Sequence, residues 1–135
     1  MKLFFRIRRR KVRRQMRRGY LAGAVTEYVQ QKSQALQFVQ NRLVHLNQTY
    51  GFVYQRVSVK NQATRWGSCS KHGNLNFHYR IIQLPPHLAD YIIVHELCHL
   101  RELNHSHKFW ELVAQSIPDY KMRRKQLRTI FVRST

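Results

Sequence analysis

The sequence predicts an α+β fold: an N-terminal helix, a small antiparallel sheet, a helix that carries the string His-Glu-Leu-Cys-His, and closing C-terminal helices. Three observations lead to this prediction. Apolar residues recur at helical spacing over residues 9–50, alternate with polar residues over 52–59 and 75–82, and return to helical spacing from about residue 87 onward. Strand-like runs grouped between helical regions are typical of the α+β class.

The first helix is expected from about Arg9 to Tyr50. Its apolar face is formed by Val25, Tyr28, Val29, Leu36, Phe38, Val39, Leu43, Val44 and Leu46. Gly19 and Gly23 interrupt the early part of this region, and glycine is a poor helix former. We therefore expect that these glycines can divide the helix into two pieces.

Two strands are expected in the middle of the chain. Residues 52–59 and 75–82 alternate and are rich in β-branched and aromatic side chains, and the intervening 61–73 is rich in turn-forming residues. Residues 64–70 can pair with the second strand as a hairpin. The 74–82 strand also offers an edge to which an extended peptide can add.

Three helices are expected after the strands. Pro85-Pro86 ends the preceding segment, and a helix can begin near His87. A short helix then starts at Ser106, whose hydroxyl can cap it, and ends at Pro118. Asp119 can cap a last helix that bears the apolar residues Leu127, Ile130 and Phe131.

The string His95-Glu96-Leu97-Cys98-His99 predicts a metal site. Histidines four apart on a helix differ by about 40° in azimuth and roughly 6 Å in rise, so both can bind one ion. Glu96 is turned away from His95 by about 100°, which places it beside the ion, where a carboxylate can take a proton from a bound water. The alternative is a pair of core histidines that hydrogen-bond to backbone carbonyls, and it leaves Glu96 and His105 unexplained.

The third ligand is expected to be His105, with His107 as the alternative. Three histidines leave one coordination position open, which is typical of a catalytic zinc site. The turn between His99 and His105 has no glycine, and Asn104 is the residue that best tolerates a left-handed conformation there. Glu102 can orient a ligand histidine through its carboxylate, or form a solvated ion pair.

Composition indicates one globular domain. The chain has 135 residues, of which 43% are hydrophobic and 12% aromatic. No apolar run approaches the ~18 residues of a membrane span, and no secretory signal pattern follows the basic start. Two cysteines, Cys69 and Cys98, do not make a disulfide framework, so we expect a reducing, cytoplasmic location.

Charge is the second prominent feature. Lys and Arg number 25 against 6 Asp and Glu, a formal net charge of +19. Much of the excess lies in residues 1–18, which we expect to form a basic arm ahead of a single domain over 19–135. An Arg-rich arm is typical of contact with nucleic acid. The residues proposed for that contact are Arg8, Arg9, Arg10, Lys11, Arg13 and Arg14.

Short motifs follow one another in order over roughly residues 50–130: Arg65-Trp66-Gly67-Ser68-Cys69, Gly73-Asn74-Leu75-Asn76, Leu84-Pro85, Asp90-Tyr91, His95-Glu96-Leu97-Cys98-His99-Leu100, Asn104-His105-Ser106 and Phe109-Trp110. With this series the chain resembles the YgjP-like (DUF45, M48-related) zinc metallopeptidase family, which is related to the SprT and WLM (Wss1-like) peptidases. The resemblance implies a minimal gluzincin-like zinc peptidase fold. It implies His95, His99 and His105 as the zinc ligands and Glu96 as the catalytic acid/base. The chain departs from the family at its front, where a basic helix replaces the usual β-rich part.

The favoured function is that of a zinc-dependent (Zn2+) metallopeptidase in which Glu96 activates water to cleave a peptide or protein substrate. Two alternatives are a nucleotide (UTP-type) pyrophosphatase that uses the same metal site, and a nucleic-acid-associated binding module with a structural zinc. Asn76, His78 and Tyr120 are candidates to stabilise the oxyanion. Trp66 can line the substrate cleft, although a core position is the commoner fate of a tryptophan.

Overall fold

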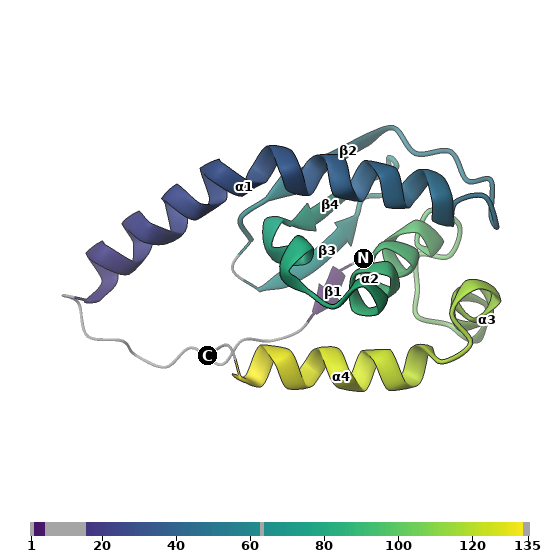
Figure 1. Ribbon diagram of the computed structural model, residues 1–135. Coiled ribbons are helices and arrows are strands. Elements are labelled where there is room, and N and C mark those ends of the chain that lie inside the picture. The colour runs from purple at the N-terminus through teal and green to yellow at the C-terminus, as the bar shows by residue number, and fades with distance from the viewer. Residues whose placement is uncertain (1, 5–15, 63, 134–135) are drawn as a thin grey trace.

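The long N-terminal helix and the helix with the histidine string enclose one face of a small sheet in the computed structural model, which describes residues 2–4, 16–62 and 64–133. The α+β class is therefore confirmed. The elements are β1 (Lys2–Phe4), α1 (Met16–Leu46), β2 (Arg56–Lys60), β3 (Arg65–Cys69), β4 (Asn74–His78), the 3-10 helix η1 (Tyr79–Gln83), α2 (Pro86–Cys98), α3 (His107–Ser116) and α4 (Tyr120–Arg133). In Figure 1, α2 lies between α1 and α4, and α3 closes one end.

The sheet has four strands in the order β1-β3-β4-β2. As the sequence predicts, β3 and β4 form an antiparallel hairpin, with Ser68 opposite Asn76. The expectation of a wholly antiparallel sheet is wrong, because β2 runs parallel to β4, with Val57 opposite Leu75. The sheet is therefore mixed, and β4 is paired on both of its edges. A peptide cannot add to β4, so that expectation is corrected as well.

The second predicted strand is shorter than its alternating pattern suggests. It ends at His78, and the next five residues form η1 instead of continuing to residue 82. The ring nitrogen Nδ1 of His78 accepts a hydrogen bond from the backbone N–H of Arg80 at 3.1 Å and so caps the new helix. This local bond turns the chain out of the sheet ahead of Pro85.

The long first helix is not divided. α1 is continuous from Met16 to Leu46, and both Gly19 and Gly23 lie inside it. Two isolated glycines cost such a helix about 1 kcal/mol each relative to alanine. Packing of the helix on η1, α2 and β2 outweighs that cost. The proposed nucleic-acid residues of the basic arm, Arg8 to Arg14, lie outside the described residues.

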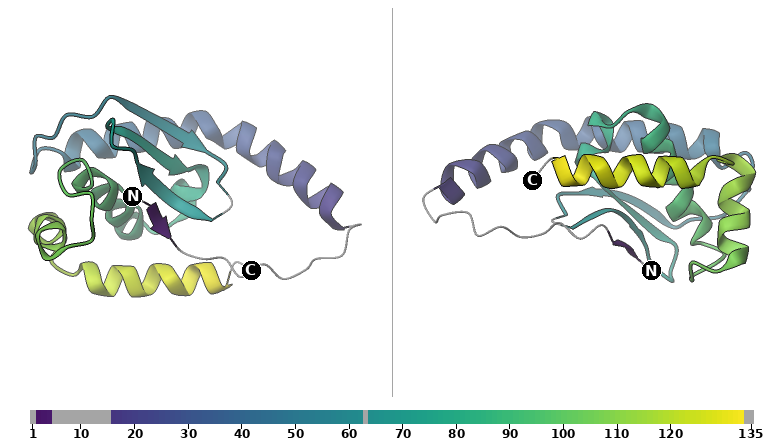
Figure 2. Two further views of the ribbon diagram at one scale, coloured as in Figure 1. Left: turned by 180° about the vertical axis from the view of Figure 1, so that it is seen from behind. Right: turned by 90° about the horizontal axis from the view of Figure 1, so that it is seen from below.

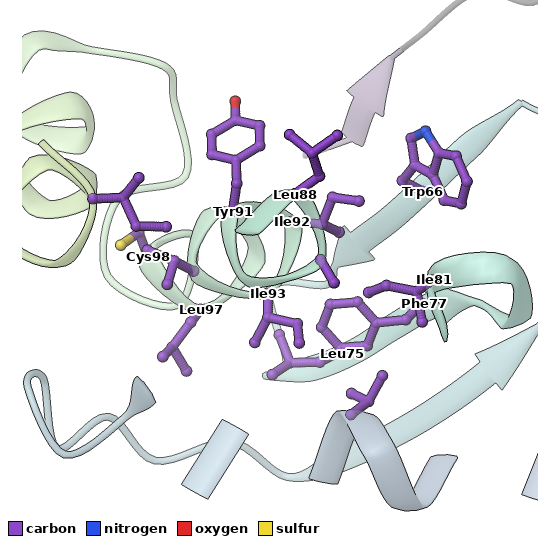
Figure 3. Close-up of a cluster of buried hydrophobic side chains, with 14 of the residues drawn as sticks. Trp66, Leu75, Phe77, Ile81, Leu88, Tyr91, Ile92, Ile93, Leu97 and Cys98 are labelled. Carbon is purple, nitrogen blue, oxygen red and sulfur yellow. The ribbon is translucent and has the colours of Figure 1, made fainter. Parts of the chain in front are cut away.

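The core lies between α1, α2 and the sheet. Leu75 and Phe77 of β4 point into it, and α2 contributes Ile93 and Leu97 (Figure 3); all four are fully buried. Ten of the thirteen residues of α2 are buried, including its polar His95 and Glu96. A helix buried on all sides places its polar groups in a medium of low dielectric constant, where they need partners.

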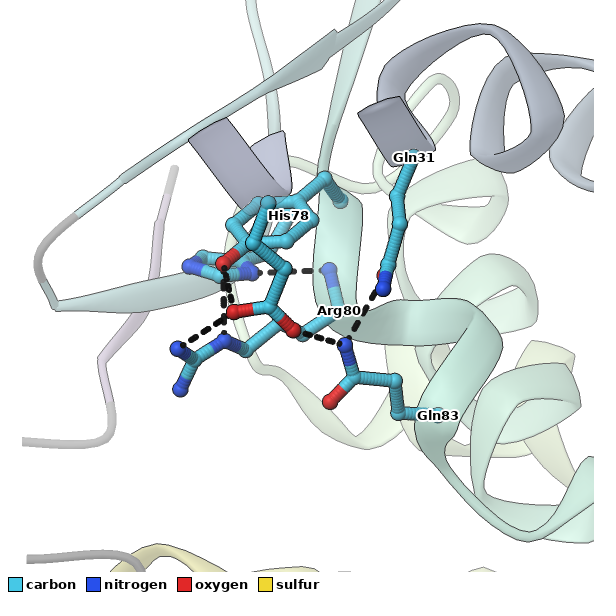
Figure 4. Close-up of polar contacts among 6 residues, drawn as sticks. Gln31, His78, Arg80 and Gln83 are labelled. Carbon is cyan, nitrogen blue, oxygen red and sulfur yellow. Dashed lines mark hydrogen bonds and ion pairs between the residues drawn. The ribbon is translucent and has the colours of Figure 1, made fainter. Parts of the chain in front are cut away.

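Two polar contacts fix α1 against α2 and η1. Arg42 of α1 forms a two-pronged ion pair with Asp90 of α2, at 2.9 and 2.8 Å. Nearer the start of α1, the amide of Gln83 donates to Gln31 and to the Glu27 carboxylate, both at 2.8 Å (Figure 4). No helix in the described part of the chain is long and apolar enough to cross a membrane.

Candidate metal centre

The end of α2 and the loop after it bring three histidines together. His95 lies in the last turn of α2, His99 is the residue that caps its C-terminus, and His105 belongs to the loop before α3. The side chain of Ser106 accepts a hydrogen bond from the N–H of Phe109 at 3.4 Å, as predicted for the start of α3. This cap ends the loop immediately after His105, and the chain there folds back onto α2.

The Nε2 atoms of His95, His99 and His105 form a triangle with sides of 3.1, 3.1 and 3.1 Å. A tetrahedral zinc ion with Zn–N distances of about 2.0–2.1 Å requires its nitrogen ligands to lie about 3.3 Å apart. The geometry therefore suits one such ion. His95 and His99 are buried and His105 is exposed, so the site opens to solvent on the side of His105.

The tautomer of His99 also fits a metal ligand. Its Nδ1 lies 2.9 Å from the backbone carbonyl of Glu102, and a carbonyl can only accept, so Nδ1 carries the hydrogen. In the neutral ring, Nε2 then has a free lone pair that faces the other two histidines. The hydroxyl of Tyr91 lies 3.4 Å from Nδ1 of His95 and can fix that ring in the same way. Glu102 thus orients His99 through its backbone, whereas the sequence suggested its carboxylate.

All three histidines are held in the neutral form that binds metal. Burial lowers the pKa of His95 well below its ordinary value, with a further contribution from His99. Burial also lowers the pKa of His99 to about 4 and that of His105 below its ordinary value. At neutral pH the cluster can therefore accept a cation without first losing protons.

Glu96 is a buried carboxyl group beside this cluster. It is fully buried, and neither of its oxygens has a hydrogen-bond partner among the residues that the structure describes. Burial raises the pKa of this carboxyl well above its ordinary value. A buried carboxyl without a partner is costly for folding, so its retention points to chemistry.

Gly67 of β3 provides the space for Glu96. A Cβ atom at this position would lie 2.9 Å from Cγ of Glu96 and 3.2 Å from the backbone oxygen of Asn76. Cβ atoms essentially never come that close to another heavy atom. The sequence shows Gly67 within the Arg65–Cys69 motif, but its contact with Glu96 depends on how α2 packs on β3.

An aromatic wall formed by Phe109, Trp110 and Tyr120 borders the histidines. Phe109 stacks on His99 with ring centroids 4.4 Å apart, and Trp110 stacks on His105 at 5.8 Å. Tyr120 stacks on Trp110 at 4.9 Å, so the wall connects it to the cluster. This wall could have been predicted from the sequence, because residues 109 and 110 follow His105 by about one helical turn.

The other predicted substrate residues lie on the β3–β4 hairpin. Gly67 faces α2, and side chains alternate along a strand, so Ser68 faces away from α2. Trp66 is 7% exposed and belongs to the core cluster that also holds residues of α2 (Figure 3). Asn76 is opposite Ser68 and shares that face, and His78 follows two residues later. Trp66 and His78 contact each other edge to face at 5.5 Å. The structure thus brings Tyr120 toward the cluster and keeps Trp66, Asn76 and His78 apart from it, and their roles toward substrate stay predictions.

His107, the alternative third ligand, does not join the cluster. Its side chain is 89% exposed and lies 2.8 Å from the carboxylate of Glu111, one helical turn further along α3. Among the described residues, the only group of three or more potential ligand side chains close enough for one ion is His95, His99 and His105.

Comparisons with known proteins place this geometry in context. Residues 8–130 match the family described as YgjP-like, metallopeptidase domain. In structure, the chain is similar to the metallopeptidase zymogen of Pyrococcus abyssi abylysin, with a TM-score of 0.62 and 25% identity over 67% of this chain and 92% of that one. It is also similar to the metallopeptidase zymogen of Methanocaldococcus jannaschii jannalysin, with a TM-score of 0.49 and 22% identity over 68% and 94%. No curated protein matches the chain.

Proposed function

The chain belongs to the YgjP-like metallopeptidase family, and from this premise we propose that it is a zinc-dependent peptidase whose ion is held by His95, His99 and His105. The observation that carries the proposal is the triangle of three Nε2 atoms at 3.1 Å, next in the chain to the fully buried carboxyl group of Glu96, which has no hydrogen-bond partner in the described part of the structure. Three neutral nitrogen donors suit zinc better than magnesium or calcium, which prefer oxygen ligands.

The residues divide the chemistry between them. When bound, zinc acts as a Lewis acid that polarises the scissile carbonyl and lowers the pKa of water. Glu96 accepts the proton of the attacking water and passes it to the departing amine. Its raised pKa suits this task, because a group that both takes and returns a proton works best near the operating pH. Tyr91 and the carbonyl of Glu102 hold two of the histidine rings in place.

A structural zinc is the weaker interpretation. Structural sites normally complete the metal shell with a fourth Cys or His, and the described residues offer no fourth side chain in this cluster. Burial raises the pKa of Cys69 to about 11 and that of Cys98 to about 12, so both remain thiols at neutral pH. Cys69 and Cys98 are both buried thiols, and this supports the proposal of a cytoplasmic location.

The variant Glu96→Gln tests the proposed role of Glu96. It keeps the shape of the side chain and removes its basicity, so casein turnover should fall by at least about 100-fold while zinc content is unchanged. The matched control is Glu111→Gln, which removes an exposed carboxylate outside the cluster and should leave turnover intact. Full turnover by Glu96→Gln would contradict the assignment. A wild-type protein that hydrolyses nucleoside triphosphates and not casein would favour the pyrophosphatase alternative.

Contact with nucleic acid through the basic arm is a separate proposal. It rests on charge alone, the six residues Arg8, Arg9, Arg10, Lys11, Arg13 and Arg14. Replacing all six by glutamine should weaken DNA binding and reduce the slope of log Kd against log salt by up to about 5. An unchanged affinity and slope would contradict the proposal.

A further inference from the structure

β3 is the strand that faces the reactive carboxyl group. It packs against α2, and a Cβ atom added at its central Gly67 would lie 2.9 Å from Cγ of Glu96. On its inner edge β3 is hydrogen-bonded to β4, with Gly67 opposite Phe77. The backbone N–H and C=O groups on its outer edge are therefore available to pair with another strand. Such a strand would lie about 4.8 Å from β3. An extended peptide at this edge would therefore run one strand away from Gly67, the residue that faces Glu96.

In this structure the outer edge is occupied by the chain itself. β1, from Lys2 to Phe4, pairs with β3 in the antiparallel direction, with Lys2 opposite Ser68 and Phe4 opposite Arg65. Its pairing thus spans Gly67. Figure 1 shows β1 beside β3 at the edge of the sheet, and Figure 2 shows the same placement from behind.

β1 is a short occupant with an irregular register. It is three residues long, and its register shifts between Lys2 and Phe4. A strand this short gains few ladder hydrogen bonds, and an irregular register reduces them further. The described helices and the other strands do not depend on it, because the hairpin of β3 and β4 and the packing of α2 are complete without it.

From these observations we infer that β3 is the peptide-binding edge of the site, and that β1 occupies it as an intramolecular competitor of the substrate. The substrate backbone runs antiparallel to β3 across Arg65–Ser68, as β1 does. The inference rests on the proposed peptidase function and names the surface and the direction in which the substrate binds. A tethered strand competes at an effective concentration in the millimolar range, so it raises KM and leaves kcat unchanged.

Two changes in β1 test this inference. Deletion of residues 2–5 removes the strand. Leu3→Pro fixes φ near −65°, away from the extended antiparallel value, between the two paired residues Lys2 and Phe4, and so disfavours the pairing of a three-residue strand. Leu3→Ala is the matched control because it shortens the same side chain and keeps the backbone donor. In casein-derived peptide cleavage, the deletion and Leu3→Pro should lower KM about tenfold or more with kcat unchanged, and Leu3→Ala should behave as wild type. Equal KM values in all four proteins would overturn the inference.

A binding measurement separates this inference from the proposed function. The probe is a fluorescein-labelled peptide with the sequence of residues 2–7, titrated against the zinc-loaded proteins and followed by fluorescence anisotropy. The deleted chain and Leu3→Pro should bind it at least tenfold more tightly than the wild type, and N-methylation of its backbone should abolish binding. If the peptide binds in this pattern but no protein cleaves any peptide, the inference stands and the proposed function fails. If peptides are cleaved but the probe binds all proteins equally, the function stands and the inference fails.

Discussion

Replacement of Gly67 by alanine tests whether the position of Glu96 controls turnover. The added Cβ would lie 2.9 Å from Cγ and 3.3 Å from Cδ of Glu96. Ordinary carbon contacts are about 3.5–4.0 Å, so the carboxyl group must move by about 0.6 Å or more. Overpacking of this kind costs about 1–3 kcal/mol of folding free energy. A displacement of about 1 Å in a catalytic group can reduce the rate about 100-fold, so we expect turnover to fall about tenfold or more.

The assay compares zinc content, casein turnover and the free energy of unfolding in urea for the same preparations. The matched control is Gly51→Ala. Gly51 has a φ of +66° with nothing within 4 Å of the added Cβ, so its substitution costs about 1–2 kcal/mol through backbone strain without touching the site. Gly67→Ala should lose turnover with its zinc content intact, and Gly51→Ala should lose only stability. If Gly67→Ala were destabilised but retained wild-type turnover, the reasoning on Glu96 would be refuted.

Three further predictions follow from other contacts. Tyr91→Phe removes the hydroxyl that lies 3.4 Å from Nδ1 of His95. Zinc affinity, measured by competition with a chelator, should therefore fall about tenfold. An unchanged affinity would show that the hydroxyl does not orient the ring. Burial, and then the nearby arginine charge, lowers the pKa of His78 to about 4, whereas the unfolded chain titrates near 6.5. As the pH falls, His78 therefore takes up a proton in the unfolded chain before it does so in the folded chain, which favours unfolding. From pH 7 to pH 4 the free energy of unfolding of the wild type should fall by up to about 3 kcal/mol more than that of His78→Gln. Parallel pH profiles of stability for the two proteins would contradict this. Arg42→Ala breaks the two-pronged ion pair with Asp90, in which the Arg42 side chain is 33% exposed and the Asp90 side chain 20%. Urea denaturation should show a loss of about 1 kcal/mol in the free energy of unfolding, with an intermediate loss for Arg42→Lys. A loss within error of zero would contradict the role of the pair.

The local parts of the fold could be predicted from the sequence. Helical spacing and the paired prolines indicate α2, and the turn around Gly73 indicates the hairpin of β3 and β4. The approach of His105 to His95 and His99 also follows from a short loop that must fold back onto its own helix. These features depend on contacts between residues close together in the chain.

The long-range parts could not be predicted in this way. Alternation of side chains does not specify strand direction, so the parallel pairing of β2 with β4 leaves no local signal. The run from Tyr79 to Ile82 alternates like a strand, but the hydrogen bond from the N–H of Arg80 to His78 turns it into a 3-10 helix. The close approach of Gly67 to Glu96 and the burial of Trp66 in the core cluster both depend on how α2 packs on the sheet.

The zinc content of the purified protein, measured for the wild type beside His105→Ala and His107→Ala, tests the central claim most directly. Nε2 of His105 lies 3.1 Å from both of the other Nε2 atoms, whereas His107 is 89% exposed and contacts Glu111. We predict one zinc ion per chain in the wild type and in His107→Ala, and loss of zinc from His105→Ala. Zinc retained by His105→Ala, or lost from His107→Ala, would contradict the three-histidine centre.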